Sequence, residues 1–131
     1  MLIVVDPHSG VPVYRQIIDQ VKFHVASGLL QPGDELPSTR NLAAELGVNP
    51  MTVSKAYNWM EREGVVERRP GLPLTVRQAP AADLEAERLE QLRARLAPTA
   101  TMVRQLGIPG QKALEVFRAL LDGQPKEGRG S

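Results

Sequence analysis

The chain has 131 residues, of which 42% are hydrophobic, and a formal net charge of +1. This length suits one small domain with an appendage, and the weak net charge means that any nucleic-acid binding must depend on where the charges are placed. The absence of cysteine excludes disulfides and thiolate zinc sites and fits a reducing cytoplasm. His8 and His24 lie far apart and predict no metal site. No apolar run approaches the ~18 residues of a membrane span, and the amino terminus lacks the features of a secretory signal.

The amino-terminal part predicts a short strand followed by a helix. The run LIVVD at residues 2–6 favours a strand that ends in a turn. A helix is expected from Val11, with Pro12 in its first turn and Gly28 at its end. Its apolar face has four-residue spacing and consists of Val13, Ile17, Val21 and Val25.

Two further helices with a short connection are predicted next. Ser38 is a suitable N-cap for a helix over residues 39–46, which Gly47 ends. Asn49 caps a third helix that ends near Gly64 and has a proline at its first position. Its residues at positions i, i+3, i+4 and i+7 are apolar and predict burial of Val53, Ala56, Tyr57 and Met60. The short glycine-containing connection is typical of a helix-turn-helix.

A β-hairpin completes this region. Residues 65–69 and 74–77 favour strands, and the turn between them is centred on Gly71. A helix, a helix-turn-helix and a hairpin form a winged-helix domain, which we place at residues 1–78.

The remaining chain predicts an all-α, two-helix tail at residues 79–123. Residues 78–82 have the composition of a linker, and a strongly helical stretch follows them. An apolar stripe with heptad-like spacing continues past Pro98, where a kink or a restart of the helix is expected. This stripe consists of Leu89, Leu92, Leu96, Thr99, Val103 and Leu106. Gly107 ends the helix.

Pro109 begins the last predicted helix, and residues 124–131 are expected to be disordered. The apolar face expected to be buried in this helix consists of Ala113, Leu114, Phe117, Leu120 and Leu121. The apolar faces of both tail helices need a partner surface to pack against. Two alternatives stay open: self-association with a second copy, or folding back on the same chain.

The third helix is a candidate DNA-binding element. No acidic residue lies between Glu45 and Glu61, and the intervening polar residues are Asn49, Thr52, Ser54, Lys55 and Asn58. A helix that enters the major groove needs such hydrogen-bonding groups and no carboxylate near phosphate. An ordinary solvated helix face would have the same composition. On this helix alone, both interpretations stay open.

Two arginine positions could add contacts to DNA. Arg40 could donate to a phosphate or to guanine, or it could pair with Glu35 or Glu45 on the protein surface. Arg69, beside Gly71, could place the hairpin tip against a minor groove, or it could be an ordinary strand residue.

Catalytic and cofactor sites are not predicted. The sequence has no nucleophile paired with a base, no glycine-rich phosphate loop and no metal-ligand spacing. We therefore expect a protein that is not an enzyme and needs no cofactor.

Several segments together resemble the GntR family of bacterial transcription regulators. They are PVYRQI, PGDELPSTRNLA, LGVNPMTVSKAY and EREGVVERR, in this order between residue 12 and the hairpin. The short all-α tail resembles the YtrA-type subfamily, in which such a tail dimerises the protein. The resemblance implies a cytoplasmic homodimer that binds double-stranded DNA at a palindromic operator and acts as a repressor, or sometimes as an activator, of transcription. It further implies a link to an ABC-transporter operon, and an unknown small-molecule effector could act at the linker or at Pro98.

The resemblance also assigns DNA contacts residue by residue. Together with Asn58 and Arg69 from the residue-based argument, the candidate DNA-binding residues are Arg40, Asn49, Met51, Thr52, Ser54, Lys55, Asn58, Arg69 and Gly71. The candidate dimerisation residues are Leu89, Leu92, Leu96, Val103, Leu106, Leu114, Phe117 and Leu121. The chain departs from the family at Pro50 or Ser54, where many relatives have arginine, and at Leu72-Pro73-Leu74 in the wing. The alternative function is a winged-helix module that binds another protein through the tail stripe and Trp59.

Overall fold

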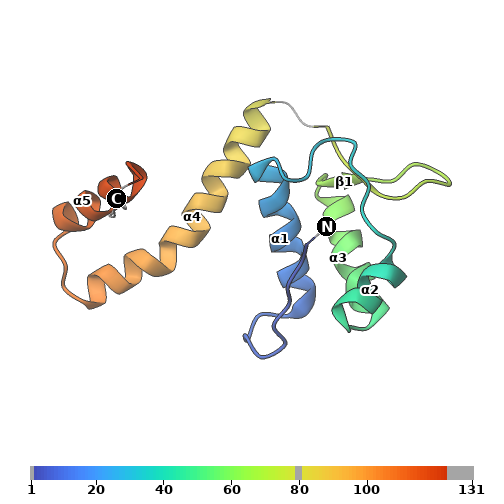
Figure 1. Cartoon of the computed structure of the whole chain (residues 1–131), viewed down its shortest axis with the longest axis horizontal. Coiled ribbons are helices and arrows are strands. Elements are labelled where there is room, and N and C mark those ends of the chain that lie inside the picture. Colours follow the sequence, from blue (N-terminus) through green and yellow to red (C-terminus); the bar gives the residue numbers. More distant parts are fainter. Residues whose placement is uncertain (1, 79–80, 124–131) are drawn as a thin grey trace. The chain divides into compact units, whose positions relative to one another are not determined.

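The computed structural model describes residues 2–78 and 81–123 (Figure 1). These residues form five helices and one two-stranded antiparallel sheet, which confirms the predicted mainly α fold with a hairpin wing. The chain divides into two compact units, Met1–Gln91 and Leu92–Ser131.

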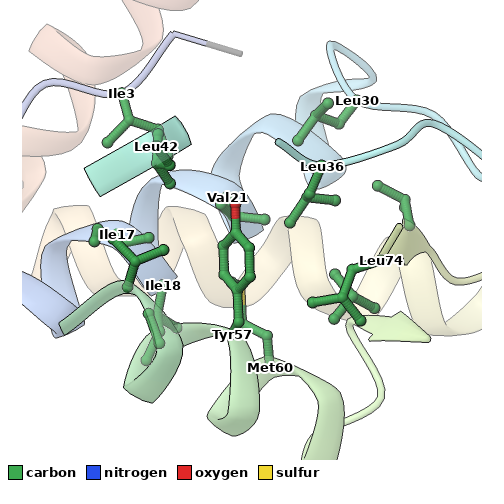
Figure 2. Close-up of a cluster of buried hydrophobic side chains, with 14 of the residues drawn as sticks. Ile3, Ile17, Ile18, Val21, Leu30, Leu36, Leu42, Tyr57, Met60 and Leu74 are labelled. Carbon is green, nitrogen blue, oxygen red and sulfur yellow. The ribbon is translucent and has the colours of Figure 1, made fainter. Parts of the chain in front are cut away.

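The core of the first unit lies among three helices, α1 (Val13–Ser27), α2 (Thr39–Leu46) and α3 (Pro50–Arg62). Figure 2 shows the Tyr57 ring among aliphatic side chains from these helices and from the wing. The four residues predicted to be buried on α3 are buried: Val53, Ala56, Tyr57 and Met60. Helical spacing therefore identified the packed face of α3 correctly.

Side-chain caps fix the ends of the two helices of the helix-turn-helix. Ser38 Oγ accepts a hydrogen bond of 3.0 Å from the Asn41 backbone N–H, and Asn49 Oδ1 accepts one of 2.8 Å from the Met51 N–H. Gly47 ends α2 with a φ of 69°, a left-handed conformation that glycine adopts without the steric cost of a Cβ. The predicted start and end of α2 and the predicted start of α3 are confirmed.

The wing is shorter than predicted and has an additional neighbour. Strand β1 (Val66–Glu67) pairs with β2 (Thr75–Val76) in the register Val66↔Val76 and Glu67↔Thr75. On its other side, β2 forms an isolated bridge between Thr75 and Glu35. The pairing to Glu35 joins residues that are far apart in the sequence, so local pattern could not predict it.

Residues 2–6 do not form a strand, so that prediction was wrong. Instead, side-chain amides of α1 form the hydrogen bonds to the backbone of this segment that a neighbouring strand would form. Gln20 Oε1 accepts from the Val4 N–H at 2.9 Å, and Gln20 Nε2 donates to the Val4 carbonyl. Gln16 bonds both backbone groups of Asp6 in the same way, each at 2.8 Å. The segment is extended because these amides satisfy its backbone polar groups.

The tail contains α4 (Ala81–Gln105) and α5 (Gly110–Leu121). Helix α4 includes Ala81 and Ala82, which were expected to belong to the linker; residues 79–80 of that linker lie outside the described residues. At Pro98, where a kink or a restart was predicted, the helix does not restart: α4 continues through this residue as one helix (Figure 1). Gly107 follows the end of α4 with a φ of 69°, as expected for a helix stop. The segment predicted to be disordered, residues 124–131, also lies outside the described residues.

The predicted burial of the apolar face of α5 is not seen within this chain. Leu114, Leu120 and Leu121 are 60%, 66% and 69% exposed, and Phe117 is half-buried. On α4, Leu89 and Leu106 are 56% and 65% exposed. Amphipathic spacing predicted which residues share a face, but it does not determine what covers that face.

Candidate nucleic-acid interface

The solvent-facing side of α3 carries polar and neutral groups. Asn49, Met51, Lys55 and Asn58 are exposed, with Met51 at 77%, and Thr52 and Ser54 are half-buried. The amino-terminal end of the helix adds the positive end of the helix dipole. The Asn49 oxygen is occupied by capping the Met51 N–H, so the amide nitrogen of Asn49 is the group that remains for an external partner.

Lys55 is held in place by an aromatic ring. Its Nζ lies 4.1 Å from the centroid of the Tyr14 ring, which belongs to α1. A cation at this distance is attracted by the ring quadrupole, which restricts the positions of the ammonium group. Tyr14 itself is half-buried against the core. Local sequence patterns could not predict this pairing, because it joins two helices that are far apart along the chain.

Arg40 is exposed on the first turn of α2, and no carboxylate among the described residues forms an ion pair with it. The predicted alternative, pairing with Glu35 or Glu45, is therefore not observed. The guanidinium keeps its donors for an external acceptor such as phosphate or the O6 and N7 atoms of guanine.

The wing arginines have different surroundings. Arg69 Nη2 lies 3.0 Å from Glu67 Oε2, and Arg68 Nε lies 3.5 Å from Glu61 Oε1. Gly71 at the tip has a φ of 75°, which favours glycine. Both arginines of the wing are therefore partly neutralised, whereas Arg40 on α2 is not.

A groove of about 640 Å³ lies between the wing and the helix-turn-helix. Its lining includes Ser38, Asn41, Ser54 and Arg68. At its base, the Tyr57 hydroxyl donates a 2.8 Å hydrogen bond to the Pro37 carbonyl. Burial raises the pKa of Tyr57 well above its usual range, and the negative charge of Glu45 raises it further. The hydroxyl therefore stays protonated, and able to donate, above the pH at which an exposed tyrosine ionises.

The described residues contain no group of three or more histidine, cysteine or acidic side chains that could hold a metal ion. His8 lies in the loop before α1, and His24 on α1 contacts the Leu2 carbonyl through Nε2 at 2.8 Å. No described helix has the length and apolar character needed to cross a bilayer.

The winged-helix geometry agrees with a comparison of the sequence with known families. The profile of the family described as "Bacterial regulatory proteins, gntR family" matches residues 13–79, just over half of the chain. The chain belongs to the GntR family. The matched region begins with α1 and ends just after the wing, so it contains every candidate DNA-binding residue.

Relatives within this family include short regulators of similar size. The HTH-type transcriptional repressor YtrA of Bacillus subtilis (strain 168) is 52% identical over 66 residues, 50% of this chain and 51% of that protein. The regulator YhcF of the same organism, described as uncharacterized, is 34% identical over 116 residues, 88% of this chain and 94% of that protein. A solved structure, "YtrA from Sulfolobus acidocaldarius, a GntR-family transcription factor", has a TM-score of 0.57 and 30% identity, covering 93% of this chain and 98% of that one.

These similarities confirm the resemblance to GntR regulators of the YtrA type. The relatives named above are transcriptional regulators rather than enzymes, which confirms the prediction that this GntR-family protein is not an enzyme. The matched segment spans about half the length of the Bacillus subtilis repressor.

Proposed function

We propose that this protein is a cytoplasmic repressor that binds a palindromic operator in double-stranded DNA as a homodimer. The observation that supports this proposal best is the exposed side of α3 from Asn49 to Asn58, which has no carboxylate, beside Arg40, which has no ion pair among the described residues. A protein surface that contacts only solvent gains nothing from excluding acidic residues, whereas a surface against phosphate does.

Different groups of this surface have different roles in the proposed complex. Arg40 donates to guanine or to a phosphate at the edge of the groove. Helix α3 enters the major groove with its amino-terminal half, and the residues available there are Asn49, Met51, Thr52, Ser54, Lys55 and Asn58. Gly71 and Arg69 bring the wing to the adjacent backbone or minor groove. Because Arg69 is paired with Glu67, its contribution is smaller than that of Arg40.

The tail brings two winged-helix domains together. The exposed apolar residues of α4 and α5 would be covered by the same residues of a second copy, which is a two-fold arrangement. The exposed ones are Leu89, Leu92, Leu106, Leu114 and Leu121, and the half-buried Leu96, Val103 and Phe117 belong to the same proposed contact. Two recognition helices about 34 Å apart then contact half-sites one DNA turn apart.

Two finer parts of the proposal are supported by the resemblance to YtrA-type regulators alone. One is that the operator controls an ABC-transporter operon. The other is that a small-molecule effector changes the operator affinity through the tail. Footprinting on the DNA beside the genes that adjoin this one tests the first part.

Fluorescence polarisation with labelled DNA tests DNA binding itself. We expect a fragment from the upstream region to bind more tightly than random DNA of the same length, with an affinity that falls as salt rises. Equal affinity for both fragments at every salt concentration would contradict the proposal and would favour the protein-binding alternative.

A further inference from the structure

The first turns of α4 are attached to α1 by polar contacts. Arg88 Nε donates a 2.9 Å hydrogen bond to the Ala26 carbonyl. Lys22 Nζ lies 3.9 Å from Glu87 Oε1, and Gln91 Nε2 donates to Glu87 Oε2 at 2.9 Å. All of these residues belong to the same compact unit as the winged helix. We refer to the contacts of Glu87 and Arg88 with α1 as the α1–α4 joint.

The position of Ala26 explains why an arginine is suited to this place. Carbonyl groups in the last turn of a helix have no intrahelical N–H partner. In α1, the His24 and Val25 carbonyls accept hydrogen bonds from the Leu30 and Gly28 N–H groups, and the Ala26 carbonyl accepts from Arg88. The guanidinium also places a positive charge at the negative end of the α1 dipole.

Apolar packing contributes little to the joint. A groove of about 180 Å³ remains beside α4, lined by residues of α1, the α3–β1 connection and α4 that include Val25, Val65 and Leu84. Leu84 is only half-buried. Because the helix is not packed tightly here, the hydrogen bond and the ion pair are the directional contacts between this part of α4 and α1.

The joint also reaches the recognition helix. Lys22 Nζ lies 5.6 Å from the centroid of the Trp59 ring, and Trp59 belongs to α3. Lys22 thus contacts both α3 and α4. Trp59 is the only tryptophan in the chain, so its fluorescence reports on this position.

We infer that Glu87 and Arg88 are positioning residues that set the direction in which α4 leaves the winged helix, and thereby determine which half-site spacing the dimer prefers. This inference rests on the proposed function. Helix α4 ends at Gln105, so about 26 Å of helix follows Arg88. A rotation of about 10° at the joint would move the far end by about 4 Å, which exceeds the rise of one base pair, about 3.4 Å.

The test uses the full chain and a series of operators whose two half-sites are moved apart or together by one and two base pairs. Affinities are measured for the wild type, Arg88→Ala, Glu87→Ala and Glu85→Ala. Glu85 is the matched control, because it is an exposed glutamate on the same helix and forms no ion pair among the described residues. A single half-site serves to show that each variant remains folded.

We expect the wild type and Glu85→Ala to prefer one spacing. The affinity for the preferred spacing divided by the affinity for a shifted spacing should fall roughly tenfold in Arg88→Ala and roughly threefold in Glu87→Ala. The affinity for a single half-site should stay unchanged. Glu87→Ala should also change Trp59 emission, because Lys22 loses its partner in α4, whereas Glu85→Ala should not.

Two negative results have separate meanings. If the wild-type protein bound none of the operators more tightly than random DNA, the proposed function would be overturned, and this inference with it. A wild type with a clear spacing preference that Arg88→Ala and Glu87→Ala retain in full would overturn only the role of the joint.

Discussion

Arg40 and Arg69 are both exposed arginines, but their electrostatic surroundings differ. Arg69 has a carboxylate 3.0 Å away, and Arg40 has none among the described residues. A surface ion pair contributes little to stability, yet it restricts and neutralises the side chain that takes part in it. At the scale of single residues, a cation without such a partner is therefore better placed to contact DNA.

Replacing Arg40 with alanine should weaken operator binding by about 1–3 kcal/mol if the side chain pairs with guanine. Stability should be unaffected, because Arg40 is exposed. Fluorescence polarisation against operators with single base changes tests the role of Arg40. Arg62→Ala, at the carboxyl end of α3, removes the same charge and serves as the control. A variant that lost the same affinity for every sequence would identify a phosphate contact instead.

Tyr57→Phe should destabilise the fold by roughly 1–2 kcal/mol, because the Pro37 carbonyl loses its 2.8 Å donor. The raised pKa of Tyr57 also predicts a pH dependence. The unfolded chain ionises this tyrosine near its ordinary pKa of about 10, while the folded protein keeps it protonated. The contribution of protonated Tyr57 to the free energy of unfolding is therefore complete below about pH 10 and is lost as the pH rises further.

Urea unfolding at neutral and alkaline pH measures both effects of Tyr57. Wild type and Tyr14→Phe should lose stability above about pH 10, and Tyr57→Phe should lose less over the same range. Equal alkaline losses in all three proteins would argue against burial of a protonated Tyr57.

The elements of the helix-turn-helix could be predicted because their signals are local. Ser38 and Asn49 lie directly before the helices that they cap, and Gly47 lies directly after α2. The failure at residues 2–6 has a different cause. Strand-like composition there is real, but the partner groups come from Gln16 and Gln20 of a helix, and local pattern contains no information about such pairing.

The candidate site also contains some features that local sequence could predict and others that it could not. The exposed positions on α3 followed from helical spacing, so the sequence was sufficient to identify them. The Lys55–Tyr14 contact and the joint between Arg88 and Ala26 depend on packing between separate helices. Only the three-dimensional structure could show them.

At the scale of elements, Asn49→Asp separates folding from DNA binding. Aspartate is as good an N-cap as asparagine, so the stability of α3 should be retained. The new carboxylate would lie on the face proposed to contact DNA, and repulsion from phosphate should lower operator affinity roughly tenfold or more. Asn49→Ser, which keeps a cap without a charge, is the control. Thermal unfolding and polarisation measure the two properties, and undiminished binding by Asn49→Asp would argue against the placement of α3.

The whole molecule presents a large apolar surface on its tail. Residues such as Leu114 and Leu121 remain 60% and 69% exposed in the single chain. Exposed apolar area of this kind on helices of heptad-like spacing favours association with a second copy. The apolar faces of α4 and α5 are not needed to fill the core of the first unit, because that core is built from other residues.

Aspartate at both Leu114 and Leu121 should therefore produce a folded monomer. Sedimentation velocity measures the change, and Ala119→Asp, an exposed position of α5 away from the apolar face, is the control. Operator affinity should fall about 100-fold or more while the affinity for one half-site stays the same, because the second binding event is no longer intramolecular. A double variant that still sediments as a dimer would place the dimer contact elsewhere.

Methylation interference on a bound operator shows whether α3 enters the major groove of two half-sites, because methyl groups on guanine N7 lie in that groove. We expect interference at two positions related by two-fold symmetry and about ten base pairs apart, with the signal at one guanine of each half-site lost in Arg40→Ala. A bound operator without major-groove interference, or one with a single protected site, would contradict the insertion of α3 into two half-sites.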